Sequence, residues 1–121
     1  MRRDMEYRRV YAKIDLDAIE HNIKLVKEKI PARTKLALVV KADAYGHGAA
    51  VLAEEFEDMA DFFAVAEMGE AVELRCHGIK KPILILGYTS PSLYRQALDH
   101  DITLTVFQLD RIRKLSALAV S

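Results

Sequence analysis

The chain has 121 residues, of which 51% are hydrophobic, and its 18 basic residues balance its 18 acidic residues. This balance removes the long-range field that favours binding to nucleic acid or to an anionic membrane, and no apolar run approaches the length of a membrane span. The single cysteine, Cys76, excludes an internal disulfide and favours a reducing compartment. We therefore expect one soluble, cytoplasmic unit in which Cys76 is a small buried hydrophobe.

The first thirty residues predict an arm, a strand and a helix. Residues 2–9 are rich in arginine, but acidic residues interrupt them and no apolar segment follows, so we expect a solvated arm. Apolar and polar residues alternate over Tyr11–Leu16, which predicts a short strand with one exposed face. Asp17 and Glu20 have the spacing of a capping box, and the apolar positions that follow share one helical face as far as Pro31.

The rest of the chain alternates between apolar runs and amphipathic stretches. The run Leu36–Val40 is continuously apolar, which is typical of a parallel strand buried on both faces. Three further runs predict strands: Phe62–Ala66, Pro82–Gly87 and Ile102–Phe107. Four amphipathic stretches predict helices: Ala49–Ala60, Met68–His77, Pro91–Asp99 and Leu109–Val120. Gly78 is placed as a helix C-cap, and Ser90 with Pro91 as a helix start.

Strands that are each followed by a helix indicate βα units in an α/β fold. The pattern alone is compatible with a small open doubly wound sheet and with part of a (β/α)8 barrel. A complete barrel needs roughly 250 residues, about twice the length of this chain.

The segment Val39–Gly48, VVKADAYGHG, carries the residues best suited to chemistry. Lys41 follows a fully apolar strand, and active sites of parallel α/β folds lie at the carboxyl ends of strands. An amine held against apolar walls is a nucleophile suited to Schiff-base formation. The alternatives are a lysine that only extends its stem past the core, a turn role for His47, and a packing role for Tyr45. No phosphate-binding glycine fingerprint and no metal site is predicted.

The run VVKADAYGHG closely resembles the pyridoxal-phosphate attachment motif of alanine racemases. The resemblance extends through KIDLDAIEHNI, FFAVAEMGEAVELR and PILILGYTSP, from about Tyr11 to the C-terminus. It implies the N-terminal half of a (β/α)8 TIM-like barrel, with about four βα units preceded by a short strand and a helix. Related fold-type III decarboxylases and small pyridoxal-phosphate homeostasis proteins also place a lysine here, but they typically lack the Tyr-Gly-His-Gly sequence.

The resemblance assigns roles to three residues. Lys41 would hold pyridoxal 5'-phosphate as a Schiff base and act as the base on one face of the substrate Cα. Tyr45 would hydrogen-bond the cofactor phosphate, and Leu86 would lie near the cofactor. Inversion of a stereocentre also needs a group on the opposite face. In the family, this group is a tyrosine from a C-terminal β-domain of the partner subunit in a dimer.

The resemblance implies an isomerase that interconverts L- and D-alanine and supplies D-alanine for the cell wall. We expect residues 1–121 to be a partial N-terminal barrel domain, without the second half-barrel and the β-domain, and to be inactive alone. Exposed edges near Lys35–Val40 and Ile102–Phe107 would favour self-association. The alternatives are the racemase domain of a serine/alanine racemase, a non-catalytic cofactor-binding module, and a structural fragment without a ligand.

Overall fold

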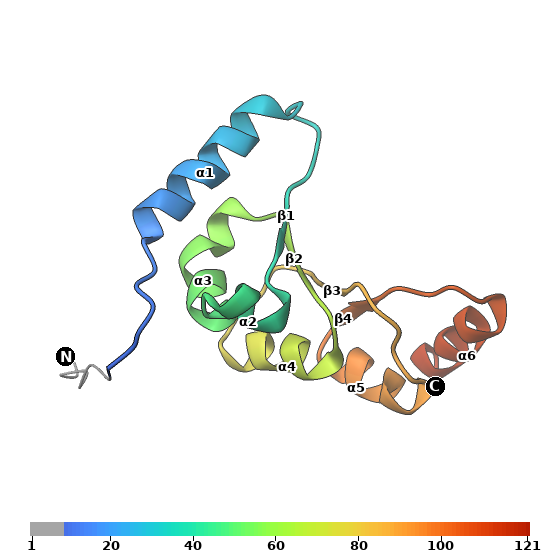
Figure 1. Ribbon diagram of the computed structural model, residues 1–121. Helices are drawn as coiled ribbons and strands as arrows, with labels where there is room; N and C mark the ends of the chain where they lie inside the picture. The colour runs from blue at the N-terminus through green and yellow to red at the C-terminus, as the bar shows by residue number, and fades with distance from the viewer. Residues whose placement is uncertain (1–8) are drawn as a thin grey trace.

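The computed structural model describes residues 9–121, so the expected arm, apart from Arg9, lies outside the described residues. Figure 1 shows helices and short strands alternating along the chain. The helices are α1 (Leu16–Lys29), α2 (Lys41–Gly46), α3 (Ala49–Phe56), α4 (Met68–Cys76), α5 (Tyr94–Asp99) and α6 (Leu109–Ala119), with 3-10 turns η1 (Glu57–Met59) and η2 (Pro91–Leu93). The strands are β1 (Ala37–Val39), β2 (Phe62–Val65), β3 (Ile83–Ile85) and β4 (Ile102–Leu104).

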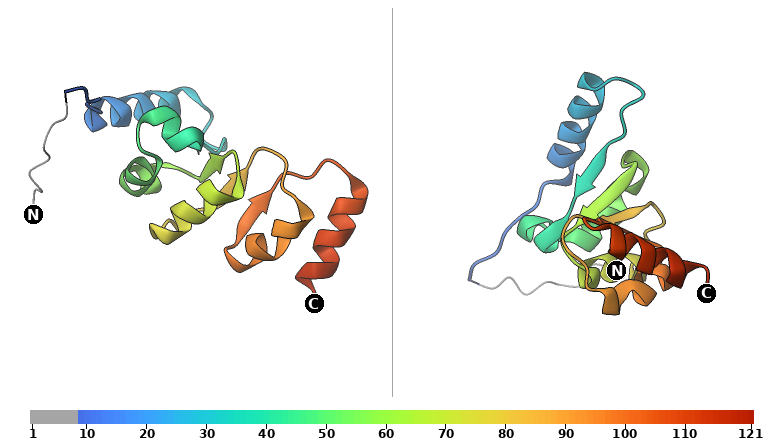
Figure 2. Two further views of the ribbon diagram at one scale, coloured as in Figure 1. Left: turned by 60° about the horizontal axis from the view of Figure 1, so that its bottom comes forward. Right: turned by 90° about the vertical axis from the view of Figure 1, so that its right-hand side faces the viewer.

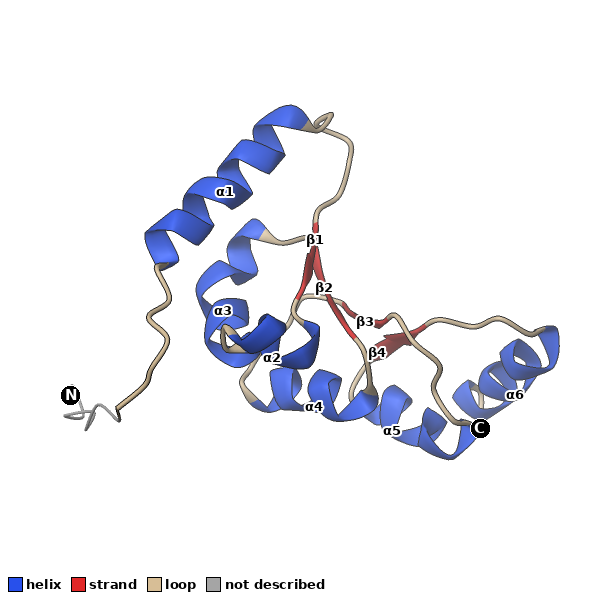
Figure 3. Ribbon diagram, in the orientation of Figure 1, coloured by secondary structure: helices blue, strands red, loops and turns tan. Residues whose placement is uncertain are grey.

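The four strands form one parallel sheet in the order β1-β2-β3-β4. Each strand lies beside the one that precedes it in the chain, so the sheet winds in one direction (Figure 3). A doubly wound sheet reverses direction at a switch point, whereas a (β/α)8 barrel does not. The topology therefore confirms the barrel alternative, and residues 9–121 contain four of the eight strands of such a barrel.

One face of the sheet carries the core, and the helices cover that face. The strand register aligns four apolar residues across the sheet: Leu38, Phe63, Ile83 and Ile102. Of these, Phe63 and Ile83 are fully buried, and Figures 1 and 2 show α3, α4 and α5 arranged along one side of the sheet. Side chains alternate along a strand, so the next row, which contains Val39, faces the other way. Val39 is 41% exposed, which shows that this second face is open.

Strands β1 and β4 are the edges of the sheet, as the sequence predicted. Self-association through these edges remains a prediction. The predicted helix ends are also confirmed. Gly78 follows α4 with φ +87°, and Ser90 accepts a hydrogen bond from the Ser92 amide at 3.4 Å while Pro91 begins η2. No helix within residues 9–121 is both long and apolar enough to span a bilayer.

The expected strand at Tyr11–Leu16 is wrong, because residues 11–15 form no strand and α1 begins at Leu16. A strand needs a neighbouring backbone to pair with, and the only described strand beside β1 is β2. The cap of α1 also differs from the prediction. Asp15 caps the helix by accepting a hydrogen bond from the Ala18 amide at 3.1 Å, two residues before the predicted Asp17.

Cys76 is exposed, which corrects the prediction that it is buried. It is the last residue of α4, whose inner face is formed by Met68, Ala71 and Leu74. Two positions beyond Leu74, a helical residue lies on nearly the opposite side of the helix. Leu74 is therefore the last residue of α4 on its buried face, and Cys76 lies on the outer face of the helix.

Candidate functional site

Lys41 and Leu86 lie at the same end of the sheet. The Val40 amide extends the ladder between β1 and β2 by donating to the Ala64 carbonyl at 2.9 Å, and half-buried Lys41 follows directly. The Leu86 amide likewise donates to Val65 at 2.9 Å, at the end of β3. Leu86 is 42% exposed, and strand alternation with buried Ile85 places it on the open face. Two of the three predicted site residues, Lys41 and Leu86, are thus at the carboxyl edge of the sheet, with β2 between their strands.

The segment labelled α2 is a left-handed turn that begins directly after Lys41. Four successive residues without glycine have positive φ: Ala42 at 50°, Asp43 at 53°, Ala44 at 52° and Tyr45 at 57°. Each such residue costs about 1–2 kcal/mol, so surrounding contacts must offset roughly 4–8 kcal/mol. Strain of this kind persists only where neighbouring groups fix the backbone, and it is common at functional sites. The turn presents the 62% exposed Tyr45 side chain close in sequence to Lys41.

Asp43 and His47 hold this turn from within. An oxygen of the Asp43 carboxylate accepts the Ala49 amide at 2.7 Å, which ties the turn to the first residue of α3. The His47 ring lies with Nδ1 2.9 Å from the Ala44 carbonyl. Because a carbonyl oxygen only accepts, the neutral ring must carry its proton on Nδ1 to form this hydrogen bond. These contacts favour the turn role that the sequence left open for His47.

Glu70 holds the turn from outside, and the sequence analysis did not identify it. Its Oε1 accepts the Ala42 amide at 2.6 Å, and its Oε2 accepts the Ala66 amide at 2.7 Å. Glu70 is also the third residue of a capping box with Glu67 at the start of α4. The Glu-x-x-Glu spacing was therefore a readable signal for the cap. The bond to Ala42, 28 residues away in the chain, had no local signal.

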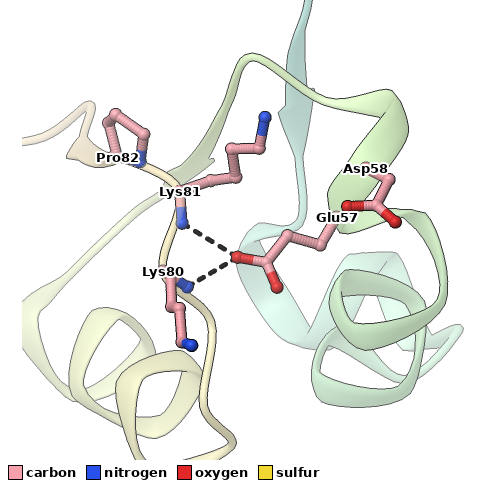
Figure 4. A pocket seen from close by; sticks show the side chains of 5 residues that line it. All are labelled: Glu57, Asp58, Lys80, Lys81 and Pro82. Atoms are coloured by element: carbon pink, nitrogen blue, oxygen red, sulfur yellow. Dashed lines mark hydrogen bonds between the residues drawn. The ribbon is translucent and has the colours of Figure 1, made fainter.

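The opposite end of the sheet contains a separate hollow of about 330 Å³, lined by Glu57, Asp58, Lys80, Lys81 and Pro82. Oε1 of Glu57 accepts the amides of Lys80 and Lys81 at 2.6 and 2.9 Å, whereas both lysine ammonium groups point away from it (Figure 4). Burial raises the Glu57 pKa, but the two backbone hydrogen bonds and the nearby positive charges together hold this pKa below its ordinary value of 4.5. This end precedes β2 and β3, so the contacts stabilise the fold rather than serve the carboxyl edge.

Arg111 stacks on Tyr88, beyond the end of β3. The guanidinium carbon lies 4.6 Å from the ring centroid, which is within the range of a cation–π contact. The Tyr88 hydroxyl raises the pKa of Arg111, so this cation stays charged. Within residues 9–121, no group of three His, Cys, Asp or Glu side chains is arranged to hold a metal ion.

The alanine racemase N-terminal domain family matches residues 14–121. This chain belongs to that family. It is 45% identical over 111 residues to the alanine racemase of Desulforamulus reducens, and this match covers 91% of this chain and 30% of the relative. It is 49% identical over 102 residues to alanine racemase 2 of Oceanobacillus iheyensis, and this match covers 84% of this chain and 26% of the relative.

Solved alanine racemases share the fold. The enzyme of Clostridium difficile 630 superposes with a TM-score of 0.83 at 39% identity, over 87% of this chain and 28% of that chain. The Bacillus anthracis enzyme with bound L-Ala-P gives 0.80 at 40% identity, over the same shares. This chain therefore spans about 30% of the length of the curated relatives that it matches. Alanine racemases depend on pyridoxal phosphate.

Proposed function

We propose that this protein acts in the pyridoxal-phosphate-dependent racemisation of alanine, and that Lys41 is its cofactor lysine. The observation that carries the proposal is the position of Lys41, which stands at the carboxyl end of β1 immediately before a strained left-handed turn. Membership of the alanine racemase family supports it. Residues 1–121 then belong to the N-terminal barrel domain of a cytoplasmic isomerase that supplies D-alanine to the cell wall.

The side chains at the carboxyl edge fit the cofactor. Neither the Lys41 ammonium nor the Tyr45 hydroxyl forms a hydrogen bond or ion pair with another described residue, so both are available to a ligand. A primary amine suits the cofactor aldehyde, a phenol hydroxyl suits its phosphate, and the apolar Leu86 suits a face of its ring. No metal is needed for this set.

Each of these side chains has a defined task in the proposal. Bound pyridoxal phosphate supplies an electron sink for the pair left on Cα when its proton is removed. Lys41 would hold the cofactor through its amine until the substrate amino group displaces it, and the freed amine would then take or return the Cα proton on one face. Tyr45 anchors the phosphate, and Leu86 limits movement of the ring. Because inversion needs a second acid or base on the opposite face, we propose that a partner subunit of a dimer supplies it.

Reductive labelling tests the cofactor assignment. The chain is incubated with limiting pyridoxal phosphate and reduced with borohydride, and the modified lysine is located by mass spectrometry. We expect the label on Lys41 and its loss in Lys41→Ala. The matched control is Lys35→Ala, which removes an exposed lysine before β1 and should leave the labelling unchanged. Labelling spread evenly over the lysines, or retained in Lys41→Ala, would refute the assignment.

A racemisation assay separates the remaining alternatives. Conversion of L-alanine and of L-serine is followed for the chain incubated with pyridoxal phosphate and left unreduced. Preference for serine would favour a serine/alanine racemase, and cofactor binding without turnover would agree with the expectation that these 121 residues are inactive alone. If a purified longer protein that contains this segment also bound the cofactor without turnover, the racemase proposal would fail and the cofactor-binding module would stand.

A further inference from the structure

Glu70 joins the carboxyl ends of two neighbouring strands through the backbone. Its two carboxylate oxygens accept the amide of Ala42, one residue after Lys41, at 2.6 Å and the amide of Ala66, just after β2, at 2.7 Å. A weaker contact from the Glu67 amide, at 3.4 Å, completes the capping box of α4. The left-handed turn α2 and helix α4 are in contact, which brings the residues that follow β1 and β2 within reach of one side chain (Figure 1).

Capping alone does not account for this arrangement. A capping box requires only that the third helical residue accept the amide of the cap, which is the longest of the three contacts. The two short contacts are to loops that follow β1 and β2, and one carboxylate oxygen is given to each loop. Short hydrogen bonds to a charged acceptor are stronger than long ones. The bonds from the Ala42 and Ala66 amides therefore contribute more of the Glu70 interaction energy than the bond from the Glu67 amide.

The backbone of Lys41 is fixed on both sides by these contacts. On the strand side, the Val40 amide donates to Ala64 at 2.9 Å. On the other side, the bond from Ala42 to Glu70 fixes the peptide plane that joins Lys41 to Ala42. The orientation of that plane sets the direction in which the Lys41 side chain leaves the backbone. Because Ala42 is also the first residue of the left-handed turn, releasing its amide would allow the strained turn to relax.

We propose that Glu70 is a positioning residue for Lys41, which orients the lysine by joining the ends of β1 and β2. This inference rests on the proposed function only in assigning a cofactor to Lys41. The backbone geometry stands independently of that assignment. Glu70 itself touches no reacting atom in this proposal.

Two substitutions separate positioning from capping. Glu70→Gln offers one acceptor oxygen in place of two, so the amides of Ala42 and Ala66 can no longer both be satisfied. Glu70→Asp keeps a carboxylate at the third position of α4, where it can still cap, but its shorter side chain cannot span both loops. The matched control is Glu73→Gln, which makes the same charge change at an exposed position of α4.

The first readout needs no cofactor. Amide hydrogen exchange of Ala42 is measured relative to that of Phe63, a core amide that donates to Pro82 at 2.9 Å. We expect Ala42 to exchange at least about tenfold faster in both Glu70 variants and to be unchanged in Glu73→Gln. Normalising to Phe63 removes any contribution from a general loss of stability. An unchanged Ala42 rate in the Glu70 variants would overturn the proposal.

The second readout is the affinity of Lys41 for pyridoxal phosphate, which is measured by borohydride trapping at a series of cofactor concentrations. We expect about tenfold weaker apparent affinity in Glu70→Gln and Glu70→Asp, equivalent to about 1.4 kcal/mol, and no change in Glu73→Gln. Affinity within twofold of the unsubstituted chain in both Glu70 variants would overturn the positioning role. If the unsubstituted chain itself is not labelled at Lys41, the proposed function fails, and the exchange of Ala42 still decides whether Glu70 fixes this backbone.

Discussion

Arg75 of α4 joins the loops at the amino ends of β3 and β4, and its removal should destabilise the fold. Its Nη1 donates to the carbonyls of Ile79 and Lys81 at 2.7 and 2.8 Å. Its Nε donates to His100 at 2.9 Å, and its Nη2 donates to Asp101 at 2.9 Å. The guanidinium thus donates to four backbone carbonyls of these two loops.

The expected magnitude follows from the surroundings of these contacts. Three of the four hydrogen bonds are part-buried and the fourth is exposed. A hydrogen bond contributes about 1 kcal/mol net where water can partly replace the lost donor, and less where it is exposed. Arg75→Met keeps most of the apolar stem and removes the donors, so we expect the free energy of unfolding to fall by about 3 kcal/mol. This is a large share of the 5–15 kcal/mol that is typical of a domain.

Urea unfolding followed by circular dichroism tests this prediction. The matched control is Arg113→Met on α6, because Arg113 is 71% exposed and its ion pair with Asp110 is long, at 3.5 Å. An exposed pair of this kind contributes little, so the control should stay within about 0.5 kcal/mol of the unsubstituted chain. A loss below about 1 kcal/mol in Arg75→Met, at an unchanged dependence on urea, would refute the reasoning.

Two further predictions concern Glu57 and Asp101. The lowered pKa of Glu57 contributes stability that is present above its ordinary value of 4.5 and is lost as the pH falls through the lowered folded-state value. We therefore expect Glu57→Gln to be less stable than the unsubstituted chain in urea at neutral pH and equally stable well below pH 4.5. Asp101 has φ +51°. Asp101→Gly should raise stability by about 0.5–1 kcal/mol, and a lower thermal midpoint would contradict this.

The order of strands and helices was predictable because each element carries its own local signal. The apolar run before Lys41 predicted a strand, and β1 covers Ala37–Val39 within it. The prediction that this strand is buried on both faces is wrong, because Val39 is 41% exposed on the open face of the sheet. Gly78 and the pair Ser90-Pro91 predicted helix boundaries, because positive φ and the missing proline donor are properties of those residues themselves. The order of the strands within the sheet, which distinguishes a barrel from a doubly wound sheet, was not predictable from these signals. Strand order depends on which strands pair, and pairing is not a property of any one segment.

The contacts around Lys41 were not predictable for the same reason. Nothing in the sequence Ala-Asp-Ala-Tyr indicates a left-handed turn, because each of these residues alone favours negative φ. The turn exists through tertiary contacts, in particular the bond from Ala42 to Glu70 across 28 positions. The wrong strand at residues 11–15 has a related cause. Alternation of polar and apolar residues reports which side is exposed, but it does not supply a partner strand.

Arg75 lies at the amino end of the sheet and Glu70 at its carboxyl end, and this separates stability from site geometry. At the amino end Arg75 binds backbone carbonyls, whereas at the carboxyl end Glu70 binds backbone amides. Because the two sets of loops are distinct, loss of Arg75 should reduce the free energy of unfolding without weakening cofactor capture by Lys41 in the folded chain. Loss of the Glu70 bridge through Glu70→Asp should weaken cofactor capture by Lys41 in the folded chain, whatever its effect on the free energy of unfolding. Equal effects of both substitutions on both properties would show that the site and the fold are one cooperative unit.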